Sequence, residues 1–379
     1  MNMTLLQDIE TPAAIVDAAR MQRNIARMQD RMNALGVSFR PHVKTAKCIA
    51  VADRQRAAGA NGITVSTLRE AEEFFAAGYD DILYAVCITP HKLGRARQLR
   101  GQGCRLTILV DTVEIAQAIV ETQSRSSDPF EVLIEVDTDG HRSGVGPEDA
   151  RLIEIARVLH AGGVTLRGVL THAGNSYELN DPEALQQLAE QERALIVRAA
   201  ERLRAAGFSC PVVSVGSTPT ALSARALDGV TEVRCGVYVF FDLFMTNVGV
   251  CALGDIALSV LTTVIGHQPD KGWIIVDAGW MAMSRDRGTA RQAHDYGYGV
   301  VCDVEGEPLK DGFVMIAANQ EHGILAAPTG SSASLGDRFP IGTRLRILPN
   351  HACATGAQFS EYHTAVDGAA VTWKRFNGW

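Results

Sequence analysis

One pattern dominates the chain as far as residue 240: short apolar, β-branched runs alternate with longer stretches of helical periodicity. Strands that are apolar on both faces and alternate with helices are typical of a parallel sheet covered on both sides. The stretches between the runs, such as 89–100, 112–124, 148–160 and 182–206, are rich in Ala, Leu, Arg, Gln and Glu. The eight runs fall at residues 37–44, 62–68, 81–87, 105–111, 131–139, 166–174, 212–218 and 232–240.

Eight strand–helix units in about 210 residues match the size of a (β/α)8 barrel. A doubly wound open sheet is the alternative, but no GxGxxG motif opens the first unit, and eight repeats favour closure of the sheet. An amphipathic helix at residues 17–34 precedes the first strand. We therefore predict an α/β protein with a (β/α)8 TIM barrel over residues 18–248.

The helical alternation stops near Val248. Short β-type runs separated by Gly, Pro and Asp turns are typical of an antiparallel β domain. We predict that residues 1–17 and 249–379 form such a domain, and that the segment 11–16 adds a strand to it. The runs that indicate it lie at residues 256–267, 272–277, 299–304, 312–317, 322–327 and 343–349.

Charge and cysteine usage restrict the class of protein. The 36 Lys and Arg residues against 43 Asp and Glu give a net charge of −7 without a basic block, so nucleic acid is not an expected partner. No apolar run approaches the roughly 20 residues that span a bilayer, and the N-terminus lacks a signal-peptide pattern. The eight cysteines form no CxxC pair, which is typical of reduced thiols. We expect a cytoplasmic enzyme that does not bind membranes.

Lys44 closes the first predicted strand, at the end of the barrel where barrel enzymes place catalytic groups. A lysine between apolar walls loses its proton more easily and can form a Schiff base. The chain has only six lysines against thirty arginines, which makes this position distinctive. The alternative is a structural lysine whose stem packs along the strand end.

Two sequences at the ends of the seventh and eighth predicted strands suit a phosphate group. Gly216 permits close backbone approach, Ser217 and Thr218 supply hydroxyl donors, and a following helical turn directs N–H groups outward. Gly236 and Tyr238 supply a second glycine and hydroxyl, and barrels often bind phosphate after strands seven and eight. The alternative is an ordinary helix N-cap at Ser217.

Strands five and six end in a cation and an imidazole. Arg142 is a permanent cation suited to a phenolate oxygen, and His172 can stack on or hydrogen-bond to an aromatic cofactor. Both residues could instead be structural, as an ion-pair partner and a buried histidine. The choice stays open at this level.

His351 and Cys353 lie two residues apart after a β-type run. On an extended segment such side chains point to the same face and reach one metal ion, and imidazole with thiolate favours zinc or a related transition ion. Two protein ligands leave positions for water and substrate, as a catalytic ion requires. Coincidence is the alternative for an isolated HxC pair.

In this order the motifs resemble the alanine-racemase-type (fold type III) pyridoxal-phosphate enzymes. Within that group the chain is similar to the D-threonine aldolase and D-serine dehydratase family, from Thr11 to Cys353. The motifs that carry the resemblance are PHVKT, DTDGHRSGV, THAGNSY, GSTPT, CGVY, DAGWMAMSRDRG, QEHG and PNHACATG.

The resemblance implies a role for each candidate residue. Lys44 would form the Schiff base with pyridoxal 5'-phosphate, and Arg142 would face the phenolic oxygen of the cofactor. His172 and Tyr177 would line the ring, with Tyr177 near the pyridine nitrogen. His351 and Cys353 would bind a divalent ion (zinc, manganese, magnesium or cobalt). The phosphate would be held by residues of the two glycine motifs: Gly216, Ser217, Thr218, Gly236 and Tyr238.

The resemblance also implies the reaction. Aldolases of the family have HxD at the metal site and dehydratases have HxC, so the HAC sequence here favours dehydration. We expect β-elimination from a D-3-hydroxy amino acid, with D-threo-3-hydroxyaspartate giving oxaloacetate and ammonia, and D-serine giving pyruvate as a second reaction. Retro-aldol cleavage to glycine and an aldehyde is the nearest alternative. Arg285, Arg287 and His294 are the candidates for binding a second substrate carboxylate.

Two further alternatives differ in class. A non-catalytic pyridoxal-phosphate homeostasis protein would lack the C-terminal β domain, and a sugar-phosphate barrel enzyme without cofactor would show no visible absorbance. Relatives of this type are homodimers, so a homodimer is expected by resemblance. The dehydratase hypothesis requires that Lys44 and the pair His351 and Cys353 flank the same cofactor ring.

Overall fold

The structure is a computed structural model that describes residues 6–123, 128–327 and 335–379. The chain divides into two compact units. One unit contains the described residues of Met1–Ile25, Thr45–Ala50 and Val237–Asn377, and the other contains Ala26–Lys44, Val51–Gly236 and Gly378–Trp379. We call them the β unit and the α/β unit. Helices α2 (Ala18–Ala34) and α3 (Ile49–Ala57) belong partly to each.

The α/β unit contains one sheet of eight parallel strands in the order β2-β9-β8-β7-β6-β5-β4-β3. Strands β2 and β9, the first and last of this sheet along the chain, are thus neighbours. Backbone hydrogen bonds also join the continuation of β2 to β3, from Val43 N to Thr64 O and from Thr64 N to Pro41 O, both 2.9 Å. The eight predicted strands are confirmed in number and direction. Their bounds are Ser38–Phe39, Ile63–Val65, Asp81–Cys87, Arg105–Val110, Glu131–Glu135, Thr165–Leu170, Val212–Val215 and Glu232–Val233, for β2 to β9.

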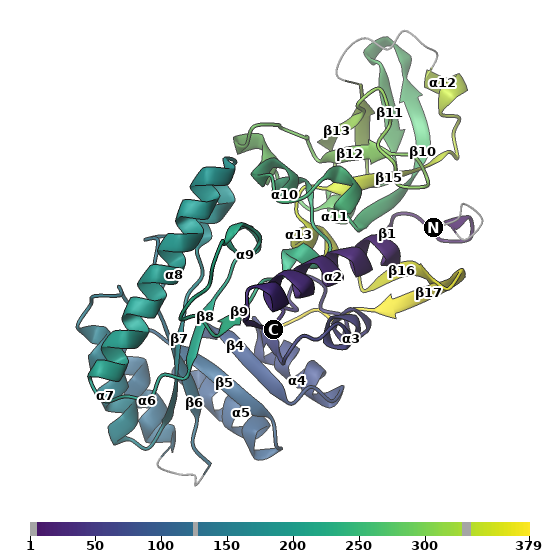
Figure 1. Ribbon diagram of the computed structural model, residues 1–379. Helices are drawn as coiled ribbons and strands as arrows, with labels where there is room; N and C mark the ends of the chain where they lie inside the picture. The colour runs from purple at the N-terminus through teal and green to yellow at the C-terminus, as the bar shows by residue number, and fades with distance from the viewer. Residues whose placement is uncertain (1–5, 124–127, 328–334) are drawn as a thin grey trace. The chain divides into compact units, whose positions relative to one another are not determined.

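Helices cover the outer face of this sheet, and α6, α7 and α8 lie side by side (Figure 1). Capping explains where two of them begin: Thr67 accepts a hydrogen bond from Glu70 N before α4, and Asp181 accepts one from Ala184 N before α8. On the inner face, leucines from four neighbouring strands form one buried cluster. The helices of this unit are α4 (Leu68–Ala76), α5 (Pro90–Gly101), α6 (Val113–Gln123), α7 (Arg151–Ala161), α8 (Pro182–Ala205) and α9 (Thr218–Ser223).

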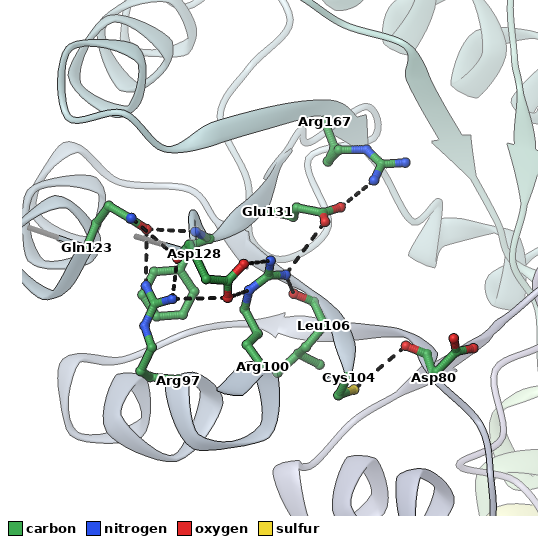
Figure 2. Close-up of polar contacts among 10 residues, drawn as sticks. Asp80, Arg97, Arg100, Cys104, Leu106, Gln123, Asp128, Glu131 and Arg167 are labelled. Carbon is green, nitrogen blue, oxygen red and sulfur yellow. Dashed lines mark hydrogen bonds and ion pairs between the residues drawn. The ribbon is translucent and has the colours of Figure 1, made fainter. Parts of the chain in front are cut away.

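Ion pairs join helix α5 to the start of β6, and join β6 to β7. Figure 2 shows the guanidinium of Arg100 between Asp128 and Glu131, with Nη2 2.9 Å from the Asp128 Oδ1 atom. Glu131 also pairs with Arg167 on β7. The Arg97 guanidinium lies 3.7 Å from the centre of the Phe130 ring. This end of the sheet, where the strands begin, is therefore occupied by structural charges.

Arg40 is the central cation of the same end. Its guanidinium lies 2.8 Å from Asp81 Oδ1 and 2.7 Å from Glu232 Oε2, and only 14% of its side chain is exposed. Burial by itself lowers the pKa of Arg40, but the two carboxylates outweigh burial and raise it. Through these two carboxylates, Arg40 links the end of β2 to the start of β4 and to the start of β9.

Replacing Arg40 by leucine should destabilise the α/β unit by about 3–5 kcal/mol, because it leaves two half-buried carboxylates without their cation. Urea unfolding followed by circular dichroism measures the loss. Arg105→Leu is the matched control, since its partner Asp80 is 64% exposed and such a pair contributes about 1 kcal/mol or less. Equal losses for the two variants would contradict this role for Arg40.

The β unit contains a nine-stranded sheet in the order β11-β14-β13-β12-β15-β10-β1-β16-β17. Because β10 pairs with β11 as well as β15, six of these strands close into an antiparallel ring. Its interior is a core of buried apolar side chains that includes Val260, Phe313 and Ile347. The predicted β domain is thus present. Its strands are β1 (Ala13–Val16), β10 (Leu258–Gln268), β11 (Trp273–Val276), β12 (Gly299–Cys302), β13 (Val314–Ala318), β14 (Gly323–Ala326), β15 (Arg344–Pro349), β16 (Glu361–Val366) and β17 (Ala369–Lys374).

Strand β1 confirms the prediction that residues 11–16 join this sheet, since it pairs with β10 and β16. The hairpin of β16 and β17 was not predicted. Its turn contains Asp367 and Gly368, both with positive φ (51° and 81°), in the Asp-Gly sequence that favours two-residue hairpins. That dipeptide was the available signal. The helices of this unit are α10 (Leu243–Val248), α11 (Trp280–Met283), α12 (Leu335–Arg338) and α13 (Ala352–Gly356).

The prediction of a strand over residues 232–240 was wrong for its second half. Strand β9 ends at Val233, and Val237–Val239 forms a 3-10 helix in which Phe240 N donates to Val237 O. Tyr238 therefore lies on a helical turn and not on a strand. Residues 237–240 are hydrophobic and buried. Hydrophobicity without alternation does not distinguish a buried strand from a buried turn. In the described part of the chain, no helix has the length and apolarity to cross a membrane.

Candidate active site

Lys44 follows the last hydrogen-bonded residues of the first strand, where Val43 N donates to Thr64 O. Its side chain is exposed. Burial first, and then the charge of Lys44, lower the pKa of both His42 and His172. The amine is thus close enough to two imidazoles of the α/β unit to influence their protonation. No described residue bonds to Nδ1 of His42, which is buried.

His172 is held in one orientation by a carbonyl oxygen. Its Nδ1 atom lies 2.6 Å from Gly216 O, so Nδ1 carries the hydrogen and donates it. The pKa of His172 is lowered to about 3, which keeps the ring neutral at pH 7. Its ring centre lies 5.9 Å from that of Tyr177. The structure therefore places the two predicted ring-lining residues next to each other.

The loop Gly216–Thr218 is tightly built. A Cβ atom on Gly216 would lie 1.7 Å from Arg234 O, so the close approach requires glycine. The Ser217 hydroxyl accepts from Thr220 N at 3.2 Å and lies 2.8 Å from Ser176 Oγ, and it caps α9. The N-cap alternative for Ser217 thus describes its observed contacts.

The Thr218 hydroxyl has a different environment. It is buried beside the Cys235 thiol, which is a weak hydrogen-bond partner, and no nitrogen or oxygen atom of a described residue bonds to it. A buried hydroxyl without a bond is costly unless a ligand supplies the acceptor. This loop therefore fits a phosphate group, with Thr218 as the side-chain donor.

Sequence analysis missed Glu192, which connects two of these loops. This carboxylate on α8 is fully buried, and its Oε1 atom accepts from Gly216 N (3.1 Å) and Ala173 N (3.2 Å). Burial raises the pKa of Glu192. The available signal was an acidic residue on the apolar stripe of an amphipathic helix, in register with Ala189 and Ile196.

Arg142 lies beside a carboxylate in the loop after β6. Its Nη2 atom is 3.8 Å from Glu135 Oε1, and 59% of its side chain is exposed. The buried Glu135 also accepts from the Cys87 thiol at 3.0 Å. Cys87, Asp111 and Glu135 form a compact cluster, in which the sulfur and carboxylate oxygen atoms lie within 4.8 Å of one another. Burial first and the two carboxylates second raise the pKa of Cys87, so its thiol stays protonated.

His351 and Cys353 do not lie on an extended segment, and that prediction was wrong. His351 is the N-cap of α13, and Thr355 N donates to His351 O at 3.0 Å. The helix start is held by the buried carboxylate of Asp242, which accepts from Ala352 N at 2.9 Å. The first helical turn nevertheless brings the imidazole and the thiol within hydrogen-bond reach of each other.

These two side chains provide a nitrogen and a sulfur donor at one place in the β unit. Cys353 Sγ also lies 3.3 Å from Thr45 Oγ1. Imidazole with thiolate is a donor set for zinc and related ions, and two protein donors leave open positions. The residues therefore fit a divalent ion of the catalytic kind.

The three candidates for binding a second substrate carboxylate are engaged in other contacts. The Arg285 guanidinium lies 4.4 Å from the Trp280 ring centre. Arg287 pairs with Asp295 at 2.8 Å. The ring centre of His294 lies 6.1 Å from that of Tyr296. The assignment of a carboxylate-binding residue therefore stays a prediction.

The parallel eight-stranded sheet and the separate antiparallel β unit are the architecture of the alanine-racemase-type enzymes, and two family models match the corresponding parts of the chain. The family model "Alanine racemase, N-terminal domain" matches residues 16–243, and "Putative serine dehydratase domain" matches residues 257–365. The chain belongs to the D-serine dehydratase and D-threonine aldolase family of these enzymes.

Three relatives illustrate this membership. D-threo-3-hydroxyaspartate dehydratase of Delftia sp. (strain HT23) is 66% identical over all of both chains, and its structure superposes with a TM-score of 0.97 over 99% of each. D-serine dehydratase of Dictyostelium discoideum is 31% identical over 94% of each chain. D-threonine aldolase of Filomicrobium marinum is 26% identical, with a TM-score of 0.80 over 97% of this chain and 96% of its own.

The low pKa of His172 predicts a loss of stability in acid. Its pKa is about 3 when folded and about 6.5 when unfolded, so below pH 6.5 the unfolded chain binds a proton that the native protein does not. Stability therefore falls as the pH falls, by about 2 kcal/mol at pH 5. Urea unfolding of the cofactor-depleted protein at pH 7 and pH 5 measures this loss.

His172→Asn should reduce the pH dependence by that amount, whereas His91→Asn, at an exposed position, should leave it as it is. An unaltered pH dependence in His172→Asn would show that this imidazole is not held neutral.

Proposed function

We propose that this protein converts D-threo-3-hydroxyaspartate to oxaloacetate and ammonia, with pyridoxal 5'-phosphate and a divalent metal ion as cofactors. Water would be eliminated first, and hydrolysis of the resulting imine would take the water up again and release ammonia. D-serine, which would give pyruvate, is the proposed second substrate. The observation that carries the proposal is the 66% identity along the whole chain to the dehydratase of Delftia sp.. The enzyme would be a carbon–nitrogen lyase.

In this proposal residues 18–248 form a closed (β/α)8 TIM barrel that binds the cofactor, and residues 1–17 with 249–379 carry the metal. The hydrogen bonds between the continuation of β2 and β3 support closure. Lys44 would hold the cofactor covalently, and Arg142, His172 and Tyr177 would surround its ring. The phosphate would lie against Gly216, Ser217, Thr218, Gly236 and Tyr238.

Pyridoxal phosphate, when bound, supplies an electron sink for the negative charge that develops at the substrate Cα atom. The amine of Lys44 would accept the Cα proton, because it is the exposed base at the end of the first strand. His172 donates from Nδ1 to Gly216 and stays neutral, so it adds no positive charge beside the amine. Glu192 holds the two loops that would contact the ring and the phosphate.

A divalent ion held by His351 and Cys353 would supply charge stabilisation for the departing β-hydroxyl, which is a poor leaving group. Two observations support this role. The imidazole and the thiol lie together, and a form of the Delftia enzyme with one cysteine replaced by alanine is known in a metal-free state. The sequence gives further support, because Thr45, which contacts the Cys353 thiol, directly follows Lys44 in the chain.

We also propose a homodimer located in the cytoplasm. All eight cysteines lie among the described residues and none of them forms a disulfide there, as expected of a reducing compartment. Light scattering during size-exclusion chromatography tests the dimer.

Lys44→Ala should abolish the visible absorbance band of the bound cofactor, because this lysine is the proposed attachment point. Absorbance spectra of the purified variant, reconstituted with excess cofactor and desalted, measure this. Lys92→Ala is the control, since its Nζ atom contacts Tyr84 OH and belongs to no proposed site. A visible band that survives in Lys44→Ala would contradict the assignment.

Ammonia and oxo-acid assays across D-serine, D-threonine and the stereoisomers of 3-hydroxyaspartate test the reaction itself. We expect most turnover with D-threo-3-hydroxyaspartate, and a loss of at least tenfold after chelation that zinc, manganese or cobalt restores. Glycine and glyoxylate without ammonia would identify an aldolase instead. Turnover that chelation leaves unchanged would remove the metal from the reaction.

A further inference from the structure

We propose that Asp286 is the positioning residue of the metal centre: its carboxylate fixes the His351 ring so that Nε2 is the atom presented to the ion. The inference rests on the proposed metal site at His351 and Cys353. It adds a carboxylate–histidine–metal arrangement through a residue to which the sequence analysis assigns no role. The DAGWMAMSRDRG motif contains Asp286, 65 residues before His351.

The first argument is the hydrogen bond. Asp286 Oδ2 lies 2.7 Å from His351 Nδ1. A carboxylate only accepts, so Nδ1 carries a hydrogen, and in the neutral ring that binds a metal the lone pair lies on Nε2. Histidines that bind metals are commonly oriented by such a partner, which also raises the basicity of the ligand nitrogen.

The second argument is that Asp286 is itself fixed. Its Oδ1 atom accepts from Gly288 N at 2.8 Å, and its backbone N donates to Ser284 Oγ at 3.2 Å. Its carbonyl oxygen accepts from Asn350 Nδ2 at 3.2 Å, and Asn350 directly precedes His351. The loop that carries the carboxylate is thus attached to the segment that carries the imidazole.

The third argument concerns the other carboxylate of this region. Asp242 Oδ2 accepts from Ala352 N and its Oδ1 from Met245 N, each at 2.9 Å, so both oxygens hold backbone and neither orients the ring. Asp286 likewise uses one oxygen on Gly288 and one on His351. The structure thus shows Asp286 as a partner of the histidine.

The test is a cobalt titration of the chelator-stripped holoenzyme, followed by the thiolate-to-cobalt absorbance band. Asp286→Ala should raise the dissociation constant for Co²⁺ by about 10- to 100-fold. Asp286→Asn, which keeps an acceptor oxygen without the charge, should give a smaller increase of several-fold. Asp295→Ala and Asp295→Asn are matched controls, because Asp295 is a nearby aspartate that pairs with Arg287 and not with His351. Both control variants should bind Co²⁺ like the unchanged protein.

Each outcome has a separate meaning. If the unchanged protein shows no thiolate–cobalt band, the metal site of the proposed function fails. If it shows the band and Asp286→Ala binds Co²⁺ equally tightly, only the present inference is overturned. Should Asp286→Ala not fold, Asp286→Asn decides, and an affinity equal to that of the unchanged protein overturns the inference. Melting temperatures of the metal-stripped variants that match the unchanged protein exclude a purely structural effect.

Discussion

The account depends on one contact, between the Cys353 thiol and the Thr45 hydroxyl at 3.3 Å. Thr45 is the first residue after Lys44, and at this peptide bond the chain passes from the α/β unit to the β unit. The residue that would hold the cofactor and the residue contacting the proposed metal ligand are therefore consecutive. In the proposed reaction, which uses a base at Cα and an ion at the β-hydroxyl, one peptide bond separates Lys44 from the residue that contacts Cys353.

Buried polar groups give the cofactor side of the proposed site its rigidity. Glu192 binds the backbone of two loops, and the Ser217 hydroxyl contacts that of Ser176, so both groups are held in position by the protein. Leaving such groups without partners would be costly, and satisfying them within the protein fixes the loops in advance. The Thr218 hydroxyl differs because its only neighbour of this kind among the described residues is the Cys235 thiol, a weak partner, which leaves room for a ligand oxygen. These two loops are thus held in place by contacts within the protein.

The sequence predicted what periodicity and local chemistry determine. The eight parallel strands, the β unit and the contribution of β1 follow from alternation and turn residues. The 3-10 turn at Tyr238 was not predictable from hydrophobicity, since every residue around it is buried. His351 and Cys353 were identified by residue type, but their helical geometry depends on the Asp242 carboxylate, 109 residues before His351. Glu192 and Asp286 act through tertiary contacts, so only the burial of Glu192 on an apolar helix face gave a local signal.

The most direct test is a crystal structure of the zinc-loaded holoenzyme with a substrate analogue, with zinc located by its anomalous scattering. The account predicts a zinc peak between His351 Nε2 and Cys353 Sγ, and one analogue molecule that contacts both this zinc and the cofactor bound to Lys44. A zinc peak at that pair in a cavity separate from the cofactor, with the analogue touching only one of them, would contradict it.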